Sequence, residues 1–255
     1  MAGDKSVQRV AVITGAGSGI GKGIAERLAR KGYRIIAIDC SESVHMVVSS
    51  LHEMGHAVEA VVLNVTDESA VRNLVASIVD RYDRLDILVN NAGIHPKING
   101  ERASALSLST EVWNEVLAVN ITAPFVFSRE AVPAMRRNGW GRIINMSSRA
   151  GRMVVGTAGV HYATAKAGMI GMTRVLASEV APFGITANCI APGRIETPLT
   201  AQGSAEQRTR LVAEIPVGRI GIPDEIGHAV EFLASEESAY ITGAVLDVNG
   251  GTFMP

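Results

Sequence analysis

The sequence has few cysteines, and their placement predicts neither a disulfide framework nor a thiolate metal site. Of the 255 residues only Cys40 and Cys189 are cysteines, and no C-x-x-C motif is present. This cysteine usage is typical of a reducing compartment, so we expect a cytoplasmic protein. The i, i+4 pair His52 and His56 is better explained as a solvated helix face than as a metal site, and we predict no metal.

Long hydrophobic runs and clusters of one charge are also missing. No segment approaches the ~18 apolar residues of a membrane span, and the apolar stretch near the N-terminus is too short for a signal peptide. The formal net charge is −1 and there is no Lys/Arg run, so no electrostatic feature favours nucleic acid or an anionic membrane as a partner. We expect a small-molecule substrate, with no nucleic acid and no membrane as partners.

The composition provides enough apolar material for a well-buried core. Hydrophobic residues make up 47% of the chain and charged residues 19%, while aromatic residues are scarce at 4%. The length lies at the upper end of what one domain contains. We therefore expect a single domain over residues 1–255.

Short runs rich in β-branched residues recur along the chain, and each is apolar at consecutive positions. Such runs are typical of strands buried on both faces of a parallel sheet. Amphipathic stretches of helical length, such as residues 68–82, separate them. This alternation predicts an α/β fold with a doubly wound parallel sheet of about seven strands and helices on both faces. The strand-like runs are residues 9–14, 33–39, 57–65, 85–90, 141–147, 185–192 and 244–250.

Two segments look like exposed loops, residues 93–107 and 193–222. In a doubly wound sheet, ligands bind outside the carboxyl ends of the strands, where such loops lie. We therefore expect a substrate loop around residues 193–222.

The sequence TGAGSGIG, residues 14–21, follows the first predicted strand and opens the first predicted helix. Its glycines do not fit the G-x-G-x-x-G register, because Ile20 and Lys22 stand where the third glycine is required. A glycine turn in this place still lets the main chain approach a pyrophosphate, and a helix N-terminus offers free N–H groups and a favourable dipole. A plain tight turn is the alternative interpretation.

Asp39 ends the second predicted strand, 18 residues after Gly21. An acidic side chain in this position can accept hydrogen bonds from the hydroxyls of an adenosine ribose, and it would repel a 2′-phosphate. Ser18 follows Gly17, and no Arg or Lys is evident at the loop to hold such a phosphate. We therefore expect NAD in preference to NADP. A strand-end turn former is the alternative role of Asp39.

The sequence HYATAKAG, residues 161–168, places Tyr162 and Lys166 on one face of a predicted helix. A free tyrosine has a pKa of about 10 and is a poor acid–base group near neutrality. A neighbouring ammonium stabilises the phenolate and lowers this pKa, which suits proton exchange with an alcohol or carbonyl oxygen. The pair also occurs by chance on helices, but Ser147 and Ser148 end a predicted strand upstream, and Asn120 lies inside another predicted helix.

Together with NNAG at residues 90–93 and CIAPGRIETP at residues 189–198, these motifs resemble the classical short-chain dehydrogenase/reductase family along nearly the whole chain. The family's T-G-x-x-x-G-x-G loop is what TGAGSGIG spells. The resemblance implies a single-domain Rossmann fold, hydride transfer with a nicotinamide cofactor and a homotetramer.

The resemblance also implies catalytic roles. Tyr162 would be the acid/base, and Lys166 would lower the pKa of Tyr162 and hold the nicotinamide ribose. Ser148 would hydrogen-bond the substrate oxygen, and Asn120 would hold a water that links Lys166 to solvent. Ser148 is preferred to Ser147 because it directly precedes R-A-G. It lies 14 residues before Tyr162, where the family commonly has 13, which implies a one-residue insertion.

A cofactor-binding set follows from the same resemblance. It comprises the glycine loop, residues at the adenosine side, residues that flank the adenine and residues that cover the nicotinamide. The family often has Asp where Asn64 stands, so this chain lacks one charge beside the adenine. The set is Gly15, Ser18, Gly19, Ile20, Gly21, Asp39, Asn64, Val65, Asn90, Ala92, Gly93, Tyr162, Lys166, Pro192, Gly193, Ile195 and Thr197.

We expect the substrate to face His95, Arg149, Val155 and Arg194. Arginines near a site can clamp a carboxylate or phosphate, but they are more often surface groups paired with acids. The main expectation is an NAD(H)-dependent oxidoreductase acting on CH–OH donors, which interconverts a secondary alcohol (a polyol, sugar or hydroxy acid) and its ketone. Two alternatives stay open: a 3-oxoacyl-[acyl-carrier-protein] reductase using NADPH, and a nucleotide-binding regulator without turnover.

Overall fold

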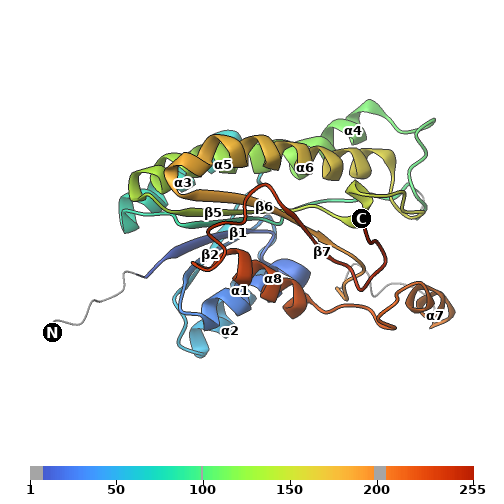
Figure 1. Ribbon diagram of the computed structural model, residues 1–255, viewed down its shortest axis with the longest axis horizontal. Coiled ribbons are helices and arrows are strands. Elements are labelled where there is room, and N and C mark those ends of the chain that lie inside the picture. Colours follow the sequence, from blue (N-terminus) through green and yellow to red (C-terminus); the bar gives the residue numbers. More distant parts are fainter. Residues whose placement is uncertain (1–7, 99, 198–204) are drawn as a thin grey trace.

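Seven parallel strands form one sheet in the computed structural model, which describes residues 8–98, 100–197 and 205–255 (Figure 1). Most strand residues are buried at consecutive positions, as strands covered on both faces should be. The sheet confirms the predicted fold class and strand number. The strands are β1 Val10–Thr14, β2 Arg34–Asp39, β3 Val58–Val62, β4 Ile87–Asn90, β5 Gly141–Met146, β6 Ile185–Pro192 and β7 Val245–Val248.

The strand order is β3-β2-β1-β4-β5-β6-β7. The chain therefore winds outward from β1 in one direction as far as β3 and then crosses back to place β4 on the other side of β1. This reversal is the topological switch point of a doubly wound sheet, where the loops after neighbouring strands diverge and leave room for a ligand.

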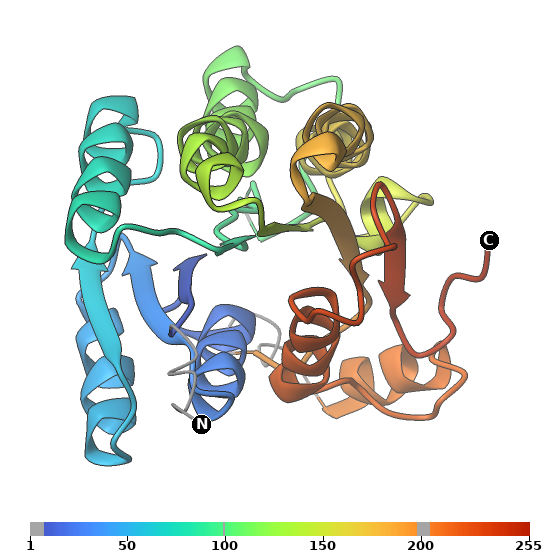
Figure 2. The same cartoon turned by 60° about the vertical axis from the view of Figure 1, so that its left-hand side comes forward.

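Helices cover both faces of the sheet. In Figure 2 the sheet is seen between two helical layers: α1, α2 and α8 pack on one face, and α3, α5 and α6 on the other. Alternate residues of a strand point to opposite faces of the sheet, so they pack into two separate hydrophobic cores. Each fully buried Ile, Leu or Phe side chain stabilises the fold by roughly 1.5–3 kcal/mol, because it leaves water. The helices are α1 Gly19–Arg30, α2 Ser43–Glu53, α3 Glu68–Tyr82, α4 Thr110–Leu117, α5 Ala123–Asn138, α6 Val160–Val180, α7 Ala205–Ala213 and α8 Pro223–Leu233.

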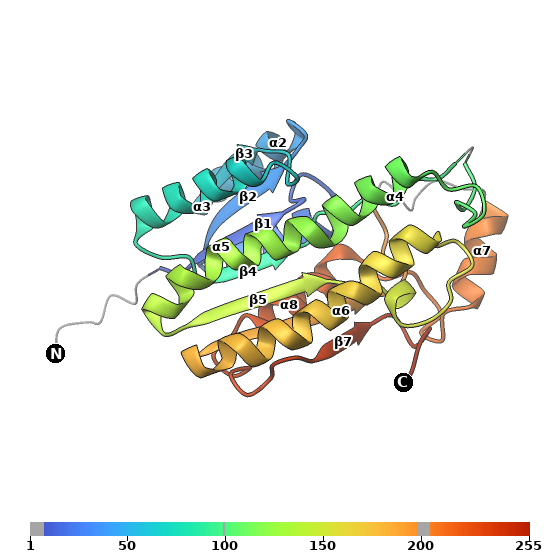
Figure 3. The same ribbon diagram turned by 90° about the horizontal axis from the view of Figure 1, so that it is seen from above.

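A π-helical turn, η1 (Ala118–Thr122), joins α4 to α5, so these elements form one long helix with a local bulge. Figure 3 shows α4 continuing α5, with α6 beside them on the same face of the sheet. Such π bulges replace the regular i→i−4 hydrogen bonds and turn one side chain out of the helical register. Here that turn holds Asn120, which is fully buried.

Two expectations about segments need correction. The run predicted as a strand over residues 57–65 is a strand only to Val62, because β3 is an edge strand that pairs with β2 alone, and the main-chain hydrogen bond from Leu63 to Asp39 is the last between them. The segment 193–222, expected to be a loop, contains the helix α7. Its residues 198–204 lie outside the described residues. None of the helices that the structure describes is long and apolar enough to cross a membrane.

Candidate functional site

A cavity of about 500 Å³ lies along the carboxyl ends of the central strands, at the switch point between β1 and β4. It runs from the glycine loop and Asp39 at one end to Tyr162 and Lys166 at the other. Every residue of the predicted cofactor-binding set lines it except Asn90, and Ser148 and His95 line it as well. The cavity also has lining residues outside the predicted cofactor-binding and substrate sets: Cys40, Leu63, Asn91, Ile94, Val119, Met146 and Ser147.

Asn90 is in the interior and not on the cavity, which corrects the prediction that it lines the adenosine side. Its Nδ2 donates to Oδ1 of Asn145 at 2.8 Å, and only 1% of the residue is exposed. The neighbouring Asn91 lines the cavity instead and donates to the main-chain oxygens of Thr14 and Gly15 at 2.9 and 3.1 Å. Asn91 thereby fixes the start of the glycine loop.

The glycine loop is shaped by close main-chain approaches. Gly15 has a φ of 67°, and a Cβ there would lie 2.9 Å from the Cα of Ala92. A Cβ on Gly21 would overlap the main-chain oxygen of Gly15. Ser18 precedes α1 and makes no capping hydrogen bond to it, so both its hydroxyl and the first N–H groups of α1 are oriented for an anion.

Asp39 receives two main-chain hydrogen bonds at the end of β2. Gly17 donates to Oδ2 at 2.9 Å and Ser41 donates to Oδ1 at 3.0 Å. Asp39 is the one acidic residue among those that line the described cavity, and Lys166, at the opposite end, is the one Lys or Arg. The end of the cavity near Asp39 is therefore negative, with no basic side chain among its described lining residues.

Asn64 and Val65 line the cavity beyond Asp39. The Oδ1 atom of Asn64 accepts hydrogen bonds from the main-chain N and the hydroxyl of Thr66 at 3.1 and 2.9 Å. This side-chain turn holds the loop after β3 in place. It leaves the 9% exposed Val65 as an apolar wall.

Ser148 and Tyr162 meet in the cavity, whereas the Ser147 hydroxyl is directed to the main chain of α6. The Ser147 hydroxyl donates to the main-chain oxygen of Lys166 at 2.8 Å, and 4% of the residue is exposed. Burial raises the pKa of Tyr162 above its ordinary value, and a hydrogen bond with Ser148 opposes that rise. The geometry thus gives the two adjacent serines different partners, with Ser148 beside the phenol.

Lys166 is buried below Tyr162, on the same face of α6. Its Nζ donates to the main-chain oxygen of Met146 at 2.8 Å and lies 5.7 Å from the centroid of the Tyr162 ring. Burial lowers the pKa of Lys166 to about 8. The expected lowering of the Tyr162 pKa by Lys166 is not found in this arrangement, because burial raises that pKa and the ammonium donates its hydrogen bond to Met146.

Asn120 clasps the main chain of Ile94 with both ends of its amide. Its Oδ1 accepts from the N–H of Ile94, and its Nδ2 donates to the oxygen of Ile94, each at 2.8 Å. A Cβ on Gly93 would lie 3.0 Å from Oδ1 of Asn120 and 3.4 Å from Nζ of Lys166. Asn120 and Lys166 therefore approach the same point beside Gly93, which a larger residue would fill.

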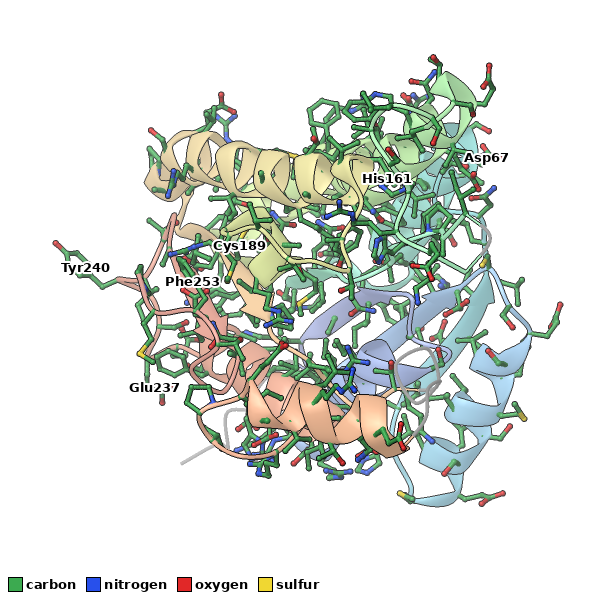
Figure 4. The ribbon with its side chains drawn as sticks, turned by 90° about the vertical axis from the view of Figure 1, so that its right-hand side faces the viewer. Asp67, His161, Cys189, Glu237, Tyr240 and Phe253 are labelled. Atoms are coloured by element: carbon green, nitrogen blue, oxygen red, sulfur yellow. The ribbon has the colours of Figure 1, made fainter. Side chains whose placement is uncertain are left out.

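His95 lies against the catalytic candidate Tyr162. Their rings stack with centroids 4.4 Å apart, and Nε2 of His95 accepts a hydrogen bond from the N–H of Gly159 at 3.3 Å. Burial, with the neighbouring His161 and Lys97, lowers the pKa of His95 and favours the neutral ring. His161 itself is fully buried at the start of α6, as Figure 4 shows, while Tyr240 projects into solvent.

Arg149, Val155 and Arg194 do not line the main cavity. Arg194 lines a smaller adjoining cavity of about 100 Å³, and Ile195 lines both. Nearby, Arg152 forms an ion pair with Asp247 at 3.4 Å. No group of three or more metal-ligating side chains gathers within the described part of the chain.

The cavity has the features that a dinucleotide requires. One end offers a glycine turn and the N-terminus of a helix, and the other end places a phenol, a hydroxyl and an ammonium together. A phenol held beside a hydroxyl and near a buried ammonium can exchange a proton with a bound oxygen. The residues present therefore fit a nicotinamide dinucleotide.

Comparisons with known proteins extend over nearly the whole chain. A family model described as enoyl-(acyl carrier protein) reductase matches residues 15–252. The 3-oxoacyl-[acyl-carrier-protein] reductase FabG of Vibrio cholerae serotype O1 is 44% identical over 248 residues, which are 96% of this chain and 98% of that protein.

Solved structures agree with the fold. A 3-oxoacyl-[acyl-carrier protein] reductase with bound NAD from Brucella melitensis has a TM-score of 0.90 at 34% identity, over 98% of this chain and 93% of that chain. A protein assigned as an NAD(P)-dependent gluconate 5-dehydrogenase from Beutenbergia cavernae, with NADP at low occupancy, has a TM-score of 0.88 at 38% identity, over 97% of both chains. These neighbours carry either cofactor.

Proposed function

The chain belongs to the short-chain dehydrogenase/reductase family, and from that premise we propose that it is an NAD(H)-dependent oxidoreductase that interconverts a secondary alcohol and its ketone. The single observation that carries the proposal is the placement of Ser148, Tyr162 and Lys166 together at one end of the cavity. Because these acid–base side chains line the same cavity as the predicted cofactor-binding residues, we favour an enzyme over the alternative of a nucleotide-binding regulator.

The cofactor would be held along the length of the cavity. Ser18 and the N–H groups of α1 would bind the pyrophosphate, and Asp39 the adenosine ribose. Lys166 would hold the nicotinamide ribose, and Pro192 and Gly193 would cover the ring. The bound nicotinamide supplies hydride exchange with the substrate carbon.

The protein's own part in the reaction is proton transfer and orientation. The Ser148 hydroxyl would hydrogen-bond the substrate oxygen and place it against Tyr162. In ketone reduction Tyr162 donates its phenolic proton to that oxygen, and in alcohol oxidation the phenolate accepts it. The raised pKa of Tyr162 keeps the phenol protonated near neutrality, which is the form that ketone reduction requires. Asn120 would hold the water that returns a proton by way of Lys166.

The preference for NAD over NADP is supported by the surroundings of Asp39. Its carboxyl group already accepts hydrogen bonds from the main-chain N–H groups of Gly17 and Ser41. A 2′-phosphate placed beside it would meet like-charge repulsion, and among the described lining residues no Arg or Lys stands near to offset this. The relatives do not decide this point, since solved neighbours carry either NAD or NADP.

A second candidate function is the reduction of a 3-oxoacyl thioester on an acyl carrier protein. The specific observation in its favour is the name of the relatives, including the Vibrio cholerae protein that is 44% identical to this chain. For the substrate, the relatives support this candidate better than a polyol, sugar or hydroxy acid. The neighbour from Beutenbergia cavernae gives the latter class its support.

Calorimetric titration with NADH and NADPH, followed by rate assays, tests the proposal. We expect NADH to bind at least about tenfold more tightly than NADPH, and Asp39→Ala to reduce that ratio. Assays of acetoacetyl thioesters for reduction, and of polyols and hydroxy acids for oxidation, then separate the two candidates. Binding of neither nucleotide would overturn the proposal, while a preference for NADPH would overturn the role of Asp39.

We also propose a homotetramer in the cytoplasm, in keeping with the family resemblance. Phe125 on α5 and Val175 on α6 are 49% and 61% exposed, which supports burial of these helices against other copies. Light scattering of the purified protein measures the oligomer mass, and a monomer would contradict the tetramer.

A further inference from the structure

Two arginines directly follow the residues that bound the catalytic end of the cavity. Arg149 comes after Ser148, and Arg194 comes after Gly193. Ser148 and Gly193 both line the cavity, so each arginine begins at its edge. A third, Arg208 on α7, lies close enough for its charge to act on Arg194, as does that of Arg149.

The main chain around Arg194 is fixed. Its oxygen accepts a hydrogen bond from the N–H of Gly221 at 3.0 Å, and the next residue, Ile195, forms a β-bridge with Gly221. The Nε atom of Arg194 is buried and has no hydrogen-bond partner within the described residues. A buried guanidinium N–H without a partner is costly, and an anion would satisfy it.

The local charge around Arg194 is positive and therefore favours a negative ligand. Burial and the like charges of Arg149 and Arg208 lower the pKa of Arg194, and Glu214 is the one acid that opposes them. Arg208 already forms an ion pair with Glu196 at 2.9 Å. Residues 198–204, PLTAQGS, contain no Asp or Glu. Because Glu214 is the one acid that acts on Arg194, and Arg149 has no ion pair among the described residues, the two arginines together keep a net positive charge.

Arg149 is held beside the site by the short helix η2 (Arg149–Gly151). Ser148 accepts a hydrogen bond from Ala150 at 3.1 Å, and a Cβ on Gly151 would lie 2.6 Å from the main chain of Lys166. The segment is therefore packed directly on α6. Arg152, at its end, pairs with Asp247, but no ion pair of Arg149 occurs among the described residues.

We propose that Arg194 and Arg149 bind an anionic group of the substrate, a carboxylate or a phosphate, at the edge of the cavity that Ser148 and Gly193 mark. This inference rests on the proposed function, because it assigns the substrate class of the same site. Two guanidinium groups on separate, fixed segments suit bidentate binding of such an anion and would set which end of the substrate enters the cavity.

The test uses ketones in matched charged and neutral pairs. Acetoacetate and methyl acetoacetate report on a carboxylate, and S-acetoacetyl-phosphopantetheine and S-acetoacetyl-pantetheine, which differ only in the phosphate, report on a phosphate. We expect the wild type to prefer the charged member of one pair, which identifies the anion. We expect Arg194→Gln and Arg149→Gln each to lower kcat/KM for that member by about 10- to 100-fold and to leave its neutral partner nearly unchanged.

Arg210→Gln is the matched control, because Arg210 is exposed on α7 and does not act on the charge of Arg194. Its kinetics should equal those of the wild type. Two results would overturn the inference. The wild type could show the same kcat/KM for the charged and neutral ketones of both pairs, or Arg194→Gln could lower kcat/KM equally for the charged and the neutral ketone.

A second readout does not depend on turnover. Malonate and inorganic phosphate are titrated by calorimetry into the NADH-saturated protein, or into the protein alone if NADH does not bind. Binding of either anion that is lost in Arg194→Gln supports the inference, and no binding of either overturns it. Failure to reduce any of the ketones with NADH, by contrast, contradicts the proposed function.

Discussion

Lys166 donates a hydrogen bond from Nζ to the main-chain oxygen of Met146 at 2.8 Å, which ties the middle of α6 to the end of β5. The contact keeps the ammonium inside the protein, where 4% of the residue is exposed. The same contact sets it 5.7 Å from the centroid of the Tyr162 ring. Because burial lowers the pKa of Lys166 to about 8, the group changes charge within the range of ordinary assays.

The rate of ketone reduction should therefore depend on the charge of Lys166. Between about pH 6 and pH 7 the ammonium is charged and Tyr162 is protonated, so kcat/KM should be constant, and it should fall with a pKa of about 8 at higher pH. In Lys166→Arg the charge persists, so this fall should move to higher pH. A pH profile of the variant that matches the wild type would contradict the assignment.

Gly21→Ala should impair cofactor binding, because its Cβ would overlap the main-chain oxygen of Gly15 in the loop. We expect NADH to bind at least about tenfold more weakly, measured by calorimetry, since the loop must shift to admit the methyl group. Gly156→Ala is the control, as a Cβ there meets nothing within 4 Å. Equal affinities for NADH in the two variants would refute the steric argument.

Asn120→Ala should destabilise the fold as well as the site. The variant leaves the N–H and the oxygen of Ile94 without partners, and two such groups cost about 2–4 kcal/mol together. Urea unfolding measures the loss. Asn64→Ala removes hydrogen bonds in an exposed turn, where water replaces them, so it should cost less than about 1 kcal/mol. A similar loss of unfolding free energy in both variants would mean that the hydrogen bonds between Asn120 and Ile94 do not stabilise the fold.

Glu225 should contribute stability that disappears in acid. Hydrogen bonds from Arg219 and the N–H of Ile222 hold its pKa at about 2, below the ordinary value of 4.5. A depressed carboxyl pKa stabilises the fold fully above pH 4.5, and the contribution is lost as the pH falls toward 2. Because the pair with Arg219 is partly exposed, the effect is about 1 kcal/mol or less.

Unfolding of Glu225→Gln near neutrality and in acid checks this sign. The variant should be less stable than the wild type near neutrality, and the difference should shrink as the acid protonates Glu225 in the wild type. Arg219→Gln should behave in the same way, since it removes the other half of the pair. A difference that grows in acid would contradict the depressed pKa.

The sequence allowed the strands and most helices to be predicted because their periodicity is local. The stretch expected to be helical over residues 68–82 is α3, and Asp67 caps its start. Where an element ends depends on partners that the sequence does not display. Residues 63–65 are as apolar as a strand, but β3 has a neighbour on one side only, and the pairing stops near Asp39.

The site was predicted at the level of motifs, and its errors come from side-chain direction. Asn90 and Asn91 are chemically identical, but Asn90 is the last residue of β4 and faces Asn145, while Asn91 has left the strand and faces the cavity. The stacking of His95 on Tyr162 joins residues far apart in the sequence. The pairing of Lys166 with Met146 is equally non-local, so no spacing rule predicts it.

The measurement that tests the account most directly is the rate of NADH oxidation by Tyr162→Phe with the ketone that the wild type reduces fastest. The substitution removes the phenolic proton and keeps the ring that stacks on His95. We predict a loss of about 100-fold or more in kcat, with NADH affinity unchanged by calorimetry. Turnover at the wild-type rate would show that Tyr162 is not the proton donor and would contradict the proposed mechanism.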